Sequence, residues 1–352
     1  MAQFLERCQL VKLLKKLLMI IVAALVVLVP LAITFTIGWR PILGPRSRPV
    51  TDRKFEATPA RLERGRYVVN SVALCFECHS EHDASLPDVP VMAGREGSGF
   101  NFGKDPDLGS DFITRNITPD KETGIGSWTD DEIARAIREG IDRDGNMLFP
   151  AMPYGDFHSM SDEDVASVIV YLRSLPPIHN NPGKLRAPFP INRLVMSVPE
   201  PITSPVNDPD MSTPLARGTH IARLAHCAAC HTPRDSRGQP MENLAFAGGS
   251  TFQAIAGGKP INSLNLTSDP SGIPYYDEAV FIKTIRTGQI GARHLNPIMP
   301  WKSFRNMTDE DLKSVWAFIS SQKPVKHLVD NSVEATMCPL CGNKHGLGEK
   351  NK

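Results

Sequence analysis

The sequence has almost no net charge, with 39 lysine and arginine residues against 38 aspartate and glutamate residues and a formal charge of +1. Proteins that bind nucleic acid through its phosphates present a basic patch or an excess of positive charge. The near balance gives no footprint for a polyanion, so we expect no nucleic-acid partner.

Cysteine is also scarce, with seven in 352 residues. Four of the seven fall in two short motifs, and the remaining three are Cys8, Cys338 and Cys341. An odd remainder does not indicate a disulfide framework. Proline, in contrast, is abundant, because the 30 prolines exceed the usual share of about 5%. They predict long extended segments.

The motif that occurs twice is Cys-x-x-Cys-His, at residues 75–79 and 227–231. Two thiols three positions apart share one face of a helical turn and reach both vinyl groups of one porphyrin, and the adjacent histidine lies beneath the iron. A single copy is also compatible with a redox dithiol or half of a zinc site. Two copies, each followed by matching sequence, predict two haem c groups. The predicted thioether and iron-binding residues are Cys75, Cys78 and His79 in the first copy and Cys227, Cys230 and His231 in the second.

A long apolar run lies near the N-terminus. Residues 17–37 are 21 consecutive positions without a charge, close to the roughly 20 that a transmembrane helix needs. The run is longer than the apolar core of a cleaved signal peptide, and no Ala-x-Ala-like cleavage site follows it. We therefore expect an uncleaved single-pass anchor at residues 17–38, in contact with the lipid bilayer through residues 17–37, after a cytoplasmic segment of residues 1–16.

Several short segments recur in the same order after each motif. The matched ranges are 116–118 and 265–267, 136–140 and 284–288, 150–154 and 297–301, and 161–164 and 308–311. Ser161 and Thr308 are each followed by three acidic residues, which is typical of an N-cap and the first turn of a helix. The repetition predicts two copies of one domain.

We place the two domains at residues 59–176 and 211–325. The remaining segments are a linker at 39–58, a proline-rich linker at 177–210 and a tail at 326–352. Residues 176–209 hold nine prolines, too many for a helix or a central strand. Apolar residues such as Phe189 and Val195 favour a strap packed along both domains over a floppy tether.

Each haem needs a ligand opposite its histidine, and Met152 and Met299 are the candidates. They lie 73 and 68 residues after His79 and His231, within matching Pro-x-Met-Pro-aromatic segments. A thioether ligand raises the haem potential relative to a harder ligand. A methionine is more often a core filler, but the shared register favours ligation. Met147 and His294, five residues upstream of each methionine, are the competing ligands.

Arg138 and Arg286 also occupy matching positions. A guanidinium is the natural partner of an anionic haem propionate, although an exposed charge on a helix face would give the same pattern. Asn116 and Asn265 either bind the propionates or shape a turn, and we favour the turn.

In the tail, Cys338 and Cys341 form a Cys-x-x-Cys pair in which Gly342 stands where a haem motif has histidine. His345 adds a possible third metal ligand, but three ligands do not close a structural zinc site. A local disulfide or an unliganded tail remains an equal alternative, and we assign no role to Cys8.

From the apolar run to about residue 325, the chain resembles the membrane-anchored dihaem members of the class I cytochrome c superfamily. Besides the haem motifs, the likeness is carried by Asn-Ile-Thr-Pro-Asp at 116–120 and Pro-Ala-Met-Pro-Tyr at 150–154, with looser versions in the second repeat. The chain is similar to the cytochrome subunits of membrane-bound alcohol and aldehyde dehydrogenases. Those subunits usually carry three haem motifs, whereas this chain has two.

The resemblance implies an all-α fold, with two tandem cytochrome c domains behind the transmembrane helix. It also implies haem attachment on the periplasmic side of the inner membrane. The expected function is electron transfer between a membrane redox donor and an acceptor, without enzymatic activity. One alternative is a fixed subunit of a membrane complex such as a dehydrogenase, an oxidase or a photosynthetic reaction centre. A dihaem peroxidase needs a displaceable axial ligand, and the paired methionines disfavour it.

Overall fold

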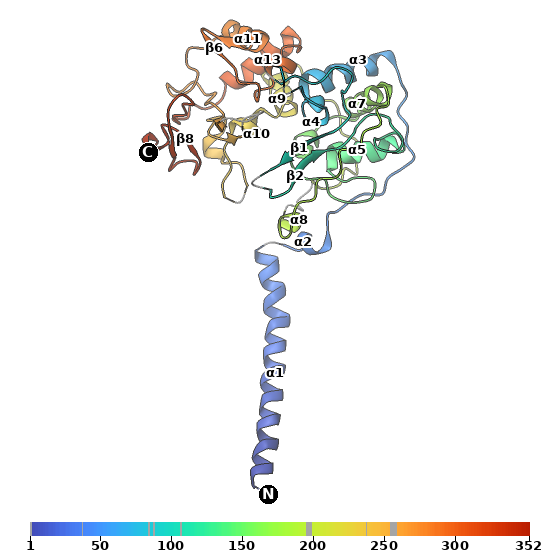
Figure 1. The fold of residues 1–352 in the computed structure, drawn as a ribbon, viewed down its shortest axis with the longest axis vertical. Coiled ribbons are helices and arrows are strands. Elements are labelled where there is room, and N and C mark those ends of the chain that lie inside the picture. The colour runs from blue at the N-terminus through green and yellow to red at the C-terminus, as the bar shows by residue number, and fades with distance from the viewer. Residues whose placement is uncertain are drawn as a thin grey trace.

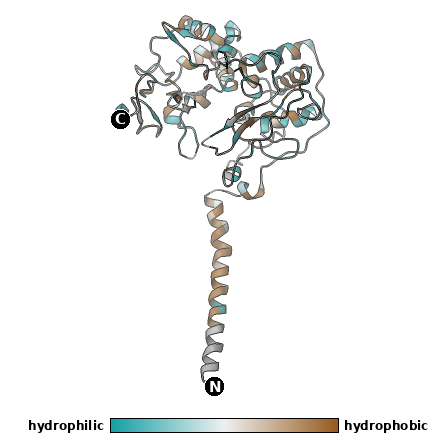
Figure 2. Cartoon of the chain, in the orientation of Figure 1, coloured by the Kyte–Doolittle hydropathy of each residue, from teal (hydrophilic) through white to brown (hydrophobic). Residues whose placement is uncertain are grey.

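The computed structural model describes residues 2–36, 38–83, 85–86, 89–105, 108–194, 199–236, 238–253 and 259–352. Helix α1 (Ala2–Phe35) projects from the rest of the chain as one isolated rod (Figure 1). Its segment Lys12–Phe35 is long and apolar enough to cross a membrane, and none of it is buried against protein. Figure 2 shows this stretch as a nearly continuous hydrophobic ribbon. Length and composition thus make it a candidate membrane anchor or signal sequence.

Helices make up most of the regular secondary structure in the described chain beyond α1. Its helices before the proline-rich linker are α2 (Arg40–Leu43), α3 (Pro59–Tyr67), the π-helical turn η1 (Val68–Val72), α4 (Cys75–His79), α5 (Asp130–Glu139), α6 (Tyr154–Phe157) and α7 (Asp162–Ser174). The later ones are α8 (Ile191–Leu194), α9 (Pro214–Leu224), α10 (Cys227–His231), η2 (Glu242–Leu244), α11 (Glu278–Thr287), α12 (Trp301–Phe304), α13 (Asp309–Ser320) and η3 (Gly348–Lys350).

Short antiparallel ribbons accompany the helices, and the all-α expectation did not include them. The paired strands are β1 (Phe100–Lys104) with β2 (Asp111–Thr114), β3 (Thr251–Phe252) with β4 (Ile261–Asn262), β5 (Gln289–Ile290) with β6 (Arg293–His294), and β7 (Ala335–Met337) with β8 (Lys344–Gly346). Each ribbon has only two strands, so none forms a sheet that could organise the core.

In each repeat, the helix before the Cys-x-x-Cys-His motif crosses the last helix of the repeat at a glycine. Helix α3 packs against α7, and α9 packs against α13. A Cβ atom at Gly65 would lie 1.9 Å from the carbonyl oxygen of Ser167, and one at Gly218 would lie 1.8 Å from that of Ser314. No side chain fits there, so the helices meet backbone to backbone. The shared crossing reproduces the sequence repeat in space.

The expected N-caps of the last helices are confirmed. The Ser161 hydroxyl accepts a hydrogen bond from the amide of Asp164, and the Thr308 hydroxyl accepts one from the amide of Asp311, both at 3.1 Å. Each bond satisfies one of the amides that a helix start leaves without an internal partner. The caps therefore fix where α7 and α13 begin.

The two repeats share one hydrophobic core. Its buried members include Val69 and Ile169 from the first repeat and Ile221 and Leu312 from the second. The contacts between repeats are reciprocal, because α6 packs against α9 and α12 packs against η1. In Figure 1 the helices of the two halves lie side by side above α1.

The proline-rich linker is tied to the first repeat near both ends. Asn116 Nδ2 donates to the carbonyl oxygen of Ile178 at 2.7 Å, and the amide of Asp162 donates to that of Val206 at 2.9 Å. The packing expected for its apolar residues is not seen at Phe189, which is 81% exposed. Val195 lies outside the described residues. The linker is thus a strap fastened by backbone hydrogen bonds.

Candidate functional site

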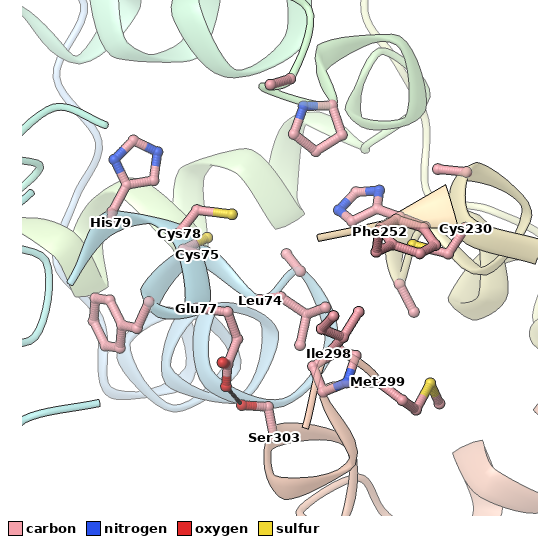
Figure 3. A pocket seen from close by; sticks show the side chains of 18 of the residues that line it. Leu74, Cys75, Glu77, Cys78, His79, Cys230, Phe252, Ile298, Met299 and Ser303 are labelled. Atoms are coloured by element: carbon pink, nitrogen blue, oxygen red, sulfur yellow. Dashed lines mark hydrogen bonds between the residues drawn. The ribbon is translucent and has the colours of Figure 1, made fainter. Parts of the chain in front are cut away.

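One cavity of about 2640 Å³ runs past both Cys-x-x-Cys-His motifs. Pockets for ordinary small ligands measure about 300–1,000 Å³, so this one has room for more than one large group. Figure 3 shows Cys75, Cys78 and His79 of α4 on one side of it, and Cys230 and Met299 from the second repeat on the other. The two motifs therefore face a shared space.

Each motif helix starts directly after a residue in the left-handed backbone region. That residue is Leu74 before α4 and His226 before α10, each with a φ of 57°. Residues with a side chain seldom adopt this conformation, and the fold around them must enforce it. Its occurrence at both motifs shows that the two repeats build the thiol-bearing turn in the same way.

The motif thiols are free and line the cavity. Burial raises the pKa of the Cys75 and Cys227 thiols to about 12 and that of Cys78 to about 11. Burial likewise raises the pKa of Cys230. A buried thiolate is disfavoured because its charge loses hydration. The raised pKa values favour the neutral form of these thiols, whose side chains line the cavity.

The two motif histidines are oriented by backbone carbonyl groups. His79 Nδ1 donates to the oxygen of Arg115 at 2.7 Å, and His231 Nδ1 donates to the oxygen of Leu264 at 2.8 Å. A carbonyl oxygen only accepts, so the hydrogen is on Nδ1 and the lone pair is on Nε2. Burial lowers the pKa of both imidazoles, which keeps them neutral. Metal-ligating histidines are held in this way.

The residue after each of these carbonyls is an asparagine that shapes a turn, as the sequence favoured. Asn116 Oδ1 accepts from the amide of Thr118, and Asn265 Oδ1 accepts from that of Thr267, both at 2.9 Å. Each Nδ2 group donates to the extended segment that follows the last helix of its repeat; for Asn265 the acceptor is the oxygen of Val325 at 2.8 Å. These turns place the carbonyls that hold the histidines.

Both candidate methionines line the cavity. Met152 and Met299 are half-buried and pack against the hydrophobic core. The competing residues line it as well, but His294 is exposed and its Nε2 lies 3.0 Å from Gln289 Nε2 across the β5–β6 ribbon. The backbone of Met147 forms an isolated antiparallel β-bridge with that of Ile141. Of the two candidate ligands in the second repeat, Met299 is therefore more enclosed by protein than His294.

The two arginines lie elsewhere than expected. Arg138 is buried and donates to the carbonyl oxygen of Met160 at 3.0 Å and to Asp162 Oδ1 at 2.7 Å. Arg286 donates to the carbonyl oxygen of Arg305 and, at 2.6 Å, to Asp309. Neither lines the cavity. We therefore replace the sequence-based assignment to haem propionates with a structural one, in which each guanidinium fastens the start of the last helix.

Polar contacts join the two repeats beside each Cys-x-x-Cys-His motif. Ser303 donates to Glu77 within the first motif (Figure 3). His226, next to the second motif, lies with Nδ1 3.0 Å from Asp156 Oδ2. Asp156 and Ser303 each lie four residues after a candidate methionine, so the segment that carries each methionine is bound to the motif of the other repeat.

Sequence reasoning missed one residue of the tail cluster. His327 lies with Cys338, Cys341 and His345 in a buried group whose ligand atoms are within 4.8 Å of one another. The internal repeat could have pointed to His327, because it lies three residues after Pro324 just as Asn180 lies three residues after Pro177.

The family model described as cytochrome c matches residues 215–323. One component of the nicotinate dehydrogenase of Pseudomonas putida is 29% identical to this chain over 307 residues, covering 80% of this chain and 23% of that protein. The chain is 31% identical over 292 residues to the cytochrome c subunit of the quinone alcohol dehydrogenase of Gluconacetobacter polyoxogenes, covering 77% of this chain and 58% of that subunit. Over 180 residues it is 30% identical to a dihaem cytochrome c-type protein of Cereibacter sphaeroides, covering 50% of this chain and 58% of that protein.

These matches confirm the resemblance expected from the sequence. The chain spans about a quarter of the first of these relatives and little more than half of the other two. Other relatives are named as cytochrome subunits of a quinone alcohol dehydrogenase, a fructose dehydrogenase and a gluconate 2-dehydrogenase.

Proposed function

We propose that this chain, which carries a cytochrome c match at residues 215–323 and an equivalent repeat before it, transfers electrons through two covalently bound haem c groups. The observation that carries the proposal is the geometry of His79 and His231. Each is half-buried beside two free thiols, with Nδ1 hydrogen-bonded to a backbone carbonyl and the lone pair left on Nε2. This donor set suits a haem iron and two thioether bonds.

The residues have distinct roles in this proposal. Cys75 and Cys78 anchor one haem, and Cys227 and Cys230 anchor the other. His79 and His231 would each hold an iron through Nε2, and Met152 and Met299 would each supply a sulfur ligand. When bound, the haem supplies reversible one-electron chemistry at a potential that its axial ligands set. A histidine and a methionine held at each iron would leave no coordination site for oxygen or peroxide.

The shared cavity supports electron passage between the two haems within one chain. Cys230 contributes to the raised pKa of Cys78, after burial and Glu77, which requires the two motifs to lie near each other. The reciprocal contacts between α6 and α9 and between α12 and η1 hold the motifs in place. We therefore propose two tandem domains that work as one rigid electron relay.

We further propose that α1 anchors the relay in the inner membrane with the haems on the periplasmic side. An anchor confines the chain to the surface where membrane partners lie and raises their effective concentration. The relatives named as dehydrogenase cytochrome subunits support a place in such a complex, where the chain receives electrons from a catalytic partner. Purification in mild detergent tests this, because stoichiometric companions accompany a fixed component of a complex and do not accompany a free carrier.

The haem count tests the core of the proposal. The pyridine haemochrome spectrum of the purified chain should give two haem c groups per polypeptide. The double variants C75A/C78A and C227A/C230A should each lose one covalent haem and keep the other. A wild-type count below two overturns the proposal. Rapid stoichiometric binding of carbon monoxide by the ferrous protein at neutral pH would instead support a dihaem peroxidase.

A further inference from the structure

The C-terminal tail holds a buried cluster that the haem sites do not use. It consists of His327, Cys338, Cys341 and His345, whose possible ligand atoms all lie within 4.8 Å of one another. Cys341 is 5% exposed and the other three are fully buried. Both cysteines are free thiols. Buried polar side chains usually have partners, and here four metal-ligating groups have mainly each other.

The spacing inside the cluster suits a tetrahedral ion. His327 Nε2 lies 3.4 Å from Cys338 Sγ, and His345 Nε2 lies 3.4 Å from Cys341 Sγ. With Zn–S bonds of about 2.3 Å and Zn–N bonds of about 2.0–2.1 Å, neighbouring ligands of a tetrahedral site lie roughly 3.3–3.8 Å apart. Little movement would bring all four atoms to bonding distance.

The outward nitrogen of each histidine is already occupied. His327 Nδ1 donates to the carbonyl oxygen of Ala247 at 2.9 Å, and His345 Nδ1 lies 3.2 Å from that of Gly346. Histidine ligands of metals characteristically donate their second N–H to a carbonyl or carboxylate, which fixes the tautomer. The two Nε2 atoms therefore face the thiols with their lone pairs available.

A comparison between the repeats shows what His327 adds. In the first repeat Asn180 occupies the matching position and donates from Nδ2 to the carbonyl oxygen of Ser98 at 3.0 Å. This is the counterpart of the bond from His327 to Ala247, which likewise ties the extended segment after the last helix to the loop after the haem motif. An asparagine performs that structural task alone. The histidine supplies a second nitrogen, and that nitrogen points at Cys338.

We infer that these four residues form a structural Cys₂His₂ zinc site. Four protein ligands with two thiolates and two imidazoles close a tetrahedral shell, which is the arrangement of structural rather than catalytic zinc. Thiolate and imidazole donors in tetrahedral geometry favour zinc over magnesium or calcium, which require oxygen ligands. The two thiolate charges neutralise the ion, so the buried site carries no net charge.

The site fastens the tail over the second half of the haem cavity. Cys338 and Cys341 pack with Leu244 and Ala247 of the loop after the second motif. Between His327 and Cys338, tail residues 328–332 line the cavity, and Asn331 is hydrogen-bonded to Asn262 of β4. Zinc thus closes a loop of chain whose middle forms part of the cavity wall.

Metal analysis of the full-length haem-loaded protein tests the inference. The chain is purified in detergent without a polyhistidine tag, and zinc per polypeptide is measured by mass spectrometry of the elements. We expect about one zinc per chain. X-ray absorption at the zinc edge, which haem iron does not disturb, should show two sulfur ligands at about 2.3 Å and two nitrogen ligands at about 2.0–2.1 Å.

Variants then assign the ligands. H345A and C341S should each reduce the zinc content at least fivefold while the covalent haem count stays the same, and should expose residues 326–352 to limited proteolysis. M337A, at a half-exposed position beside Cys338, is the matched control and should retain zinc. A wild-type chain without zinc whose tail peptide carries a Cys338–Cys341 disulfide overturns the site. So does a zinc spectrum with oxygen ligands, even if the variants fail to fold. The haem count is measured separately, so a failure here leaves the proposed electron transfer untouched.

Discussion

Tyr67 in the first repeat donates its hydroxyl hydrogen to Asp311 in the second. Asp311 also accepts from Arg217 at 3.0 Å. The matching aspartate of the first repeat, Asp164, accepts from Arg64 at 2.7 Å and has Nε2 of His220 from the second repeat at 3.8 Å. Each repeat therefore places one aromatic side chain against the buried carboxylate of the other, so the interface has approximate two-fold symmetry.

Replacing Tyr67 with phenylalanine should lower the free energy of unfolding by about 1–3 kcal/mol, because Asp311 is buried and loses one of its donors. Denaturant unfolding of the haem-loaded protein measures the change. Tyr275 is 61% exposed, and Y275F is the control, with an expected change within about 0.5 kcal/mol. Equal stability of Y67F and wild type would show that the contact between repeats contributes nothing.

The glycine crossings give a second prediction. G65A and G218A should each destabilise the protein by about 1–3 kcal/mol or more, because the new methyl group would overlap a backbone carbonyl of the partner helix. Thermal unfolding of the two variants provides the measurement. G155A is the control, since a Cβ at Gly155 in α6 meets nothing within 4 Å. If all three variants unfold at the same temperature, the prediction that Gly65 and Gly218 are required for close contact between the helices is wrong.

Local signals in the sequence predicted much of this structure. The haem motifs, the N-caps at Ser161 and Thr308 and the turns at Asn116 and Asn265 depend on neighbours within a few residues, and the spacing of residue types reveals them. Their repetition in two copies made each signal stronger than it is alone.

Contacts between distant segments were not predictable in the same way. Arg138 was expected at a propionate, but it binds the start of α7, and only the path of the chain after residue 140 brings that helix start within reach. The fourth member of the tail cluster, His327, lies 11 residues before Cys338, outside any familiar motif spacing. The packing of the two repeats around one cavity depends on contacts of α6 and α12 with the other repeat, and the residues near these helices in the sequence do not encode which distant segment they contact.

The axial ligand of the second haem can be identified by substitution. M299A should lower the potential of one haem by on the order of 100 mV, since axial ligands tune haem potentials over about 0.8 V, and should open that iron to carbon monoxide. The covalent haem count should not change. H294A tests the competing ligand and should leave spectrum and potential as in wild type, because His294 is exposed. The reverse result would assign the iron to His294. M152A should act in the same way on the first haem.

Acid sensitivity should depend on Asp164. Burial opposes its ionisation, but the interaction with His220, whose Nε2 lies 3.8 Å away, and the hydrogen bonds from Arg64 outweigh burial and lower the pKa of its carboxyl group from 3.8 to about 2. A carboxyl whose pKa is depressed by folding stabilises the folded state fully above its unfolded pKa. That contribution is lost as the pH falls through the folded pKa. The lowering of the pKa from 3.8 to about 2 corresponds to about 2–3 kcal/mol.

The variant D164N should therefore be less stable than wild type by about 2 kcal/mol at pH 5 and above. The difference should shrink as the pH falls from 4 to 2, because wild-type Asp164 becomes protonated over that window. Denaturant unfolding at each pH measures both proteins. E310Q is the control, because Glu310 pairs with Arg217 at the surface with 69% of its side chain exposed. A difference between wild type and D164N that stays constant from pH 5 to pH 2 would mean that packing, and not the charge on Asp164, stabilises the contact between the repeats.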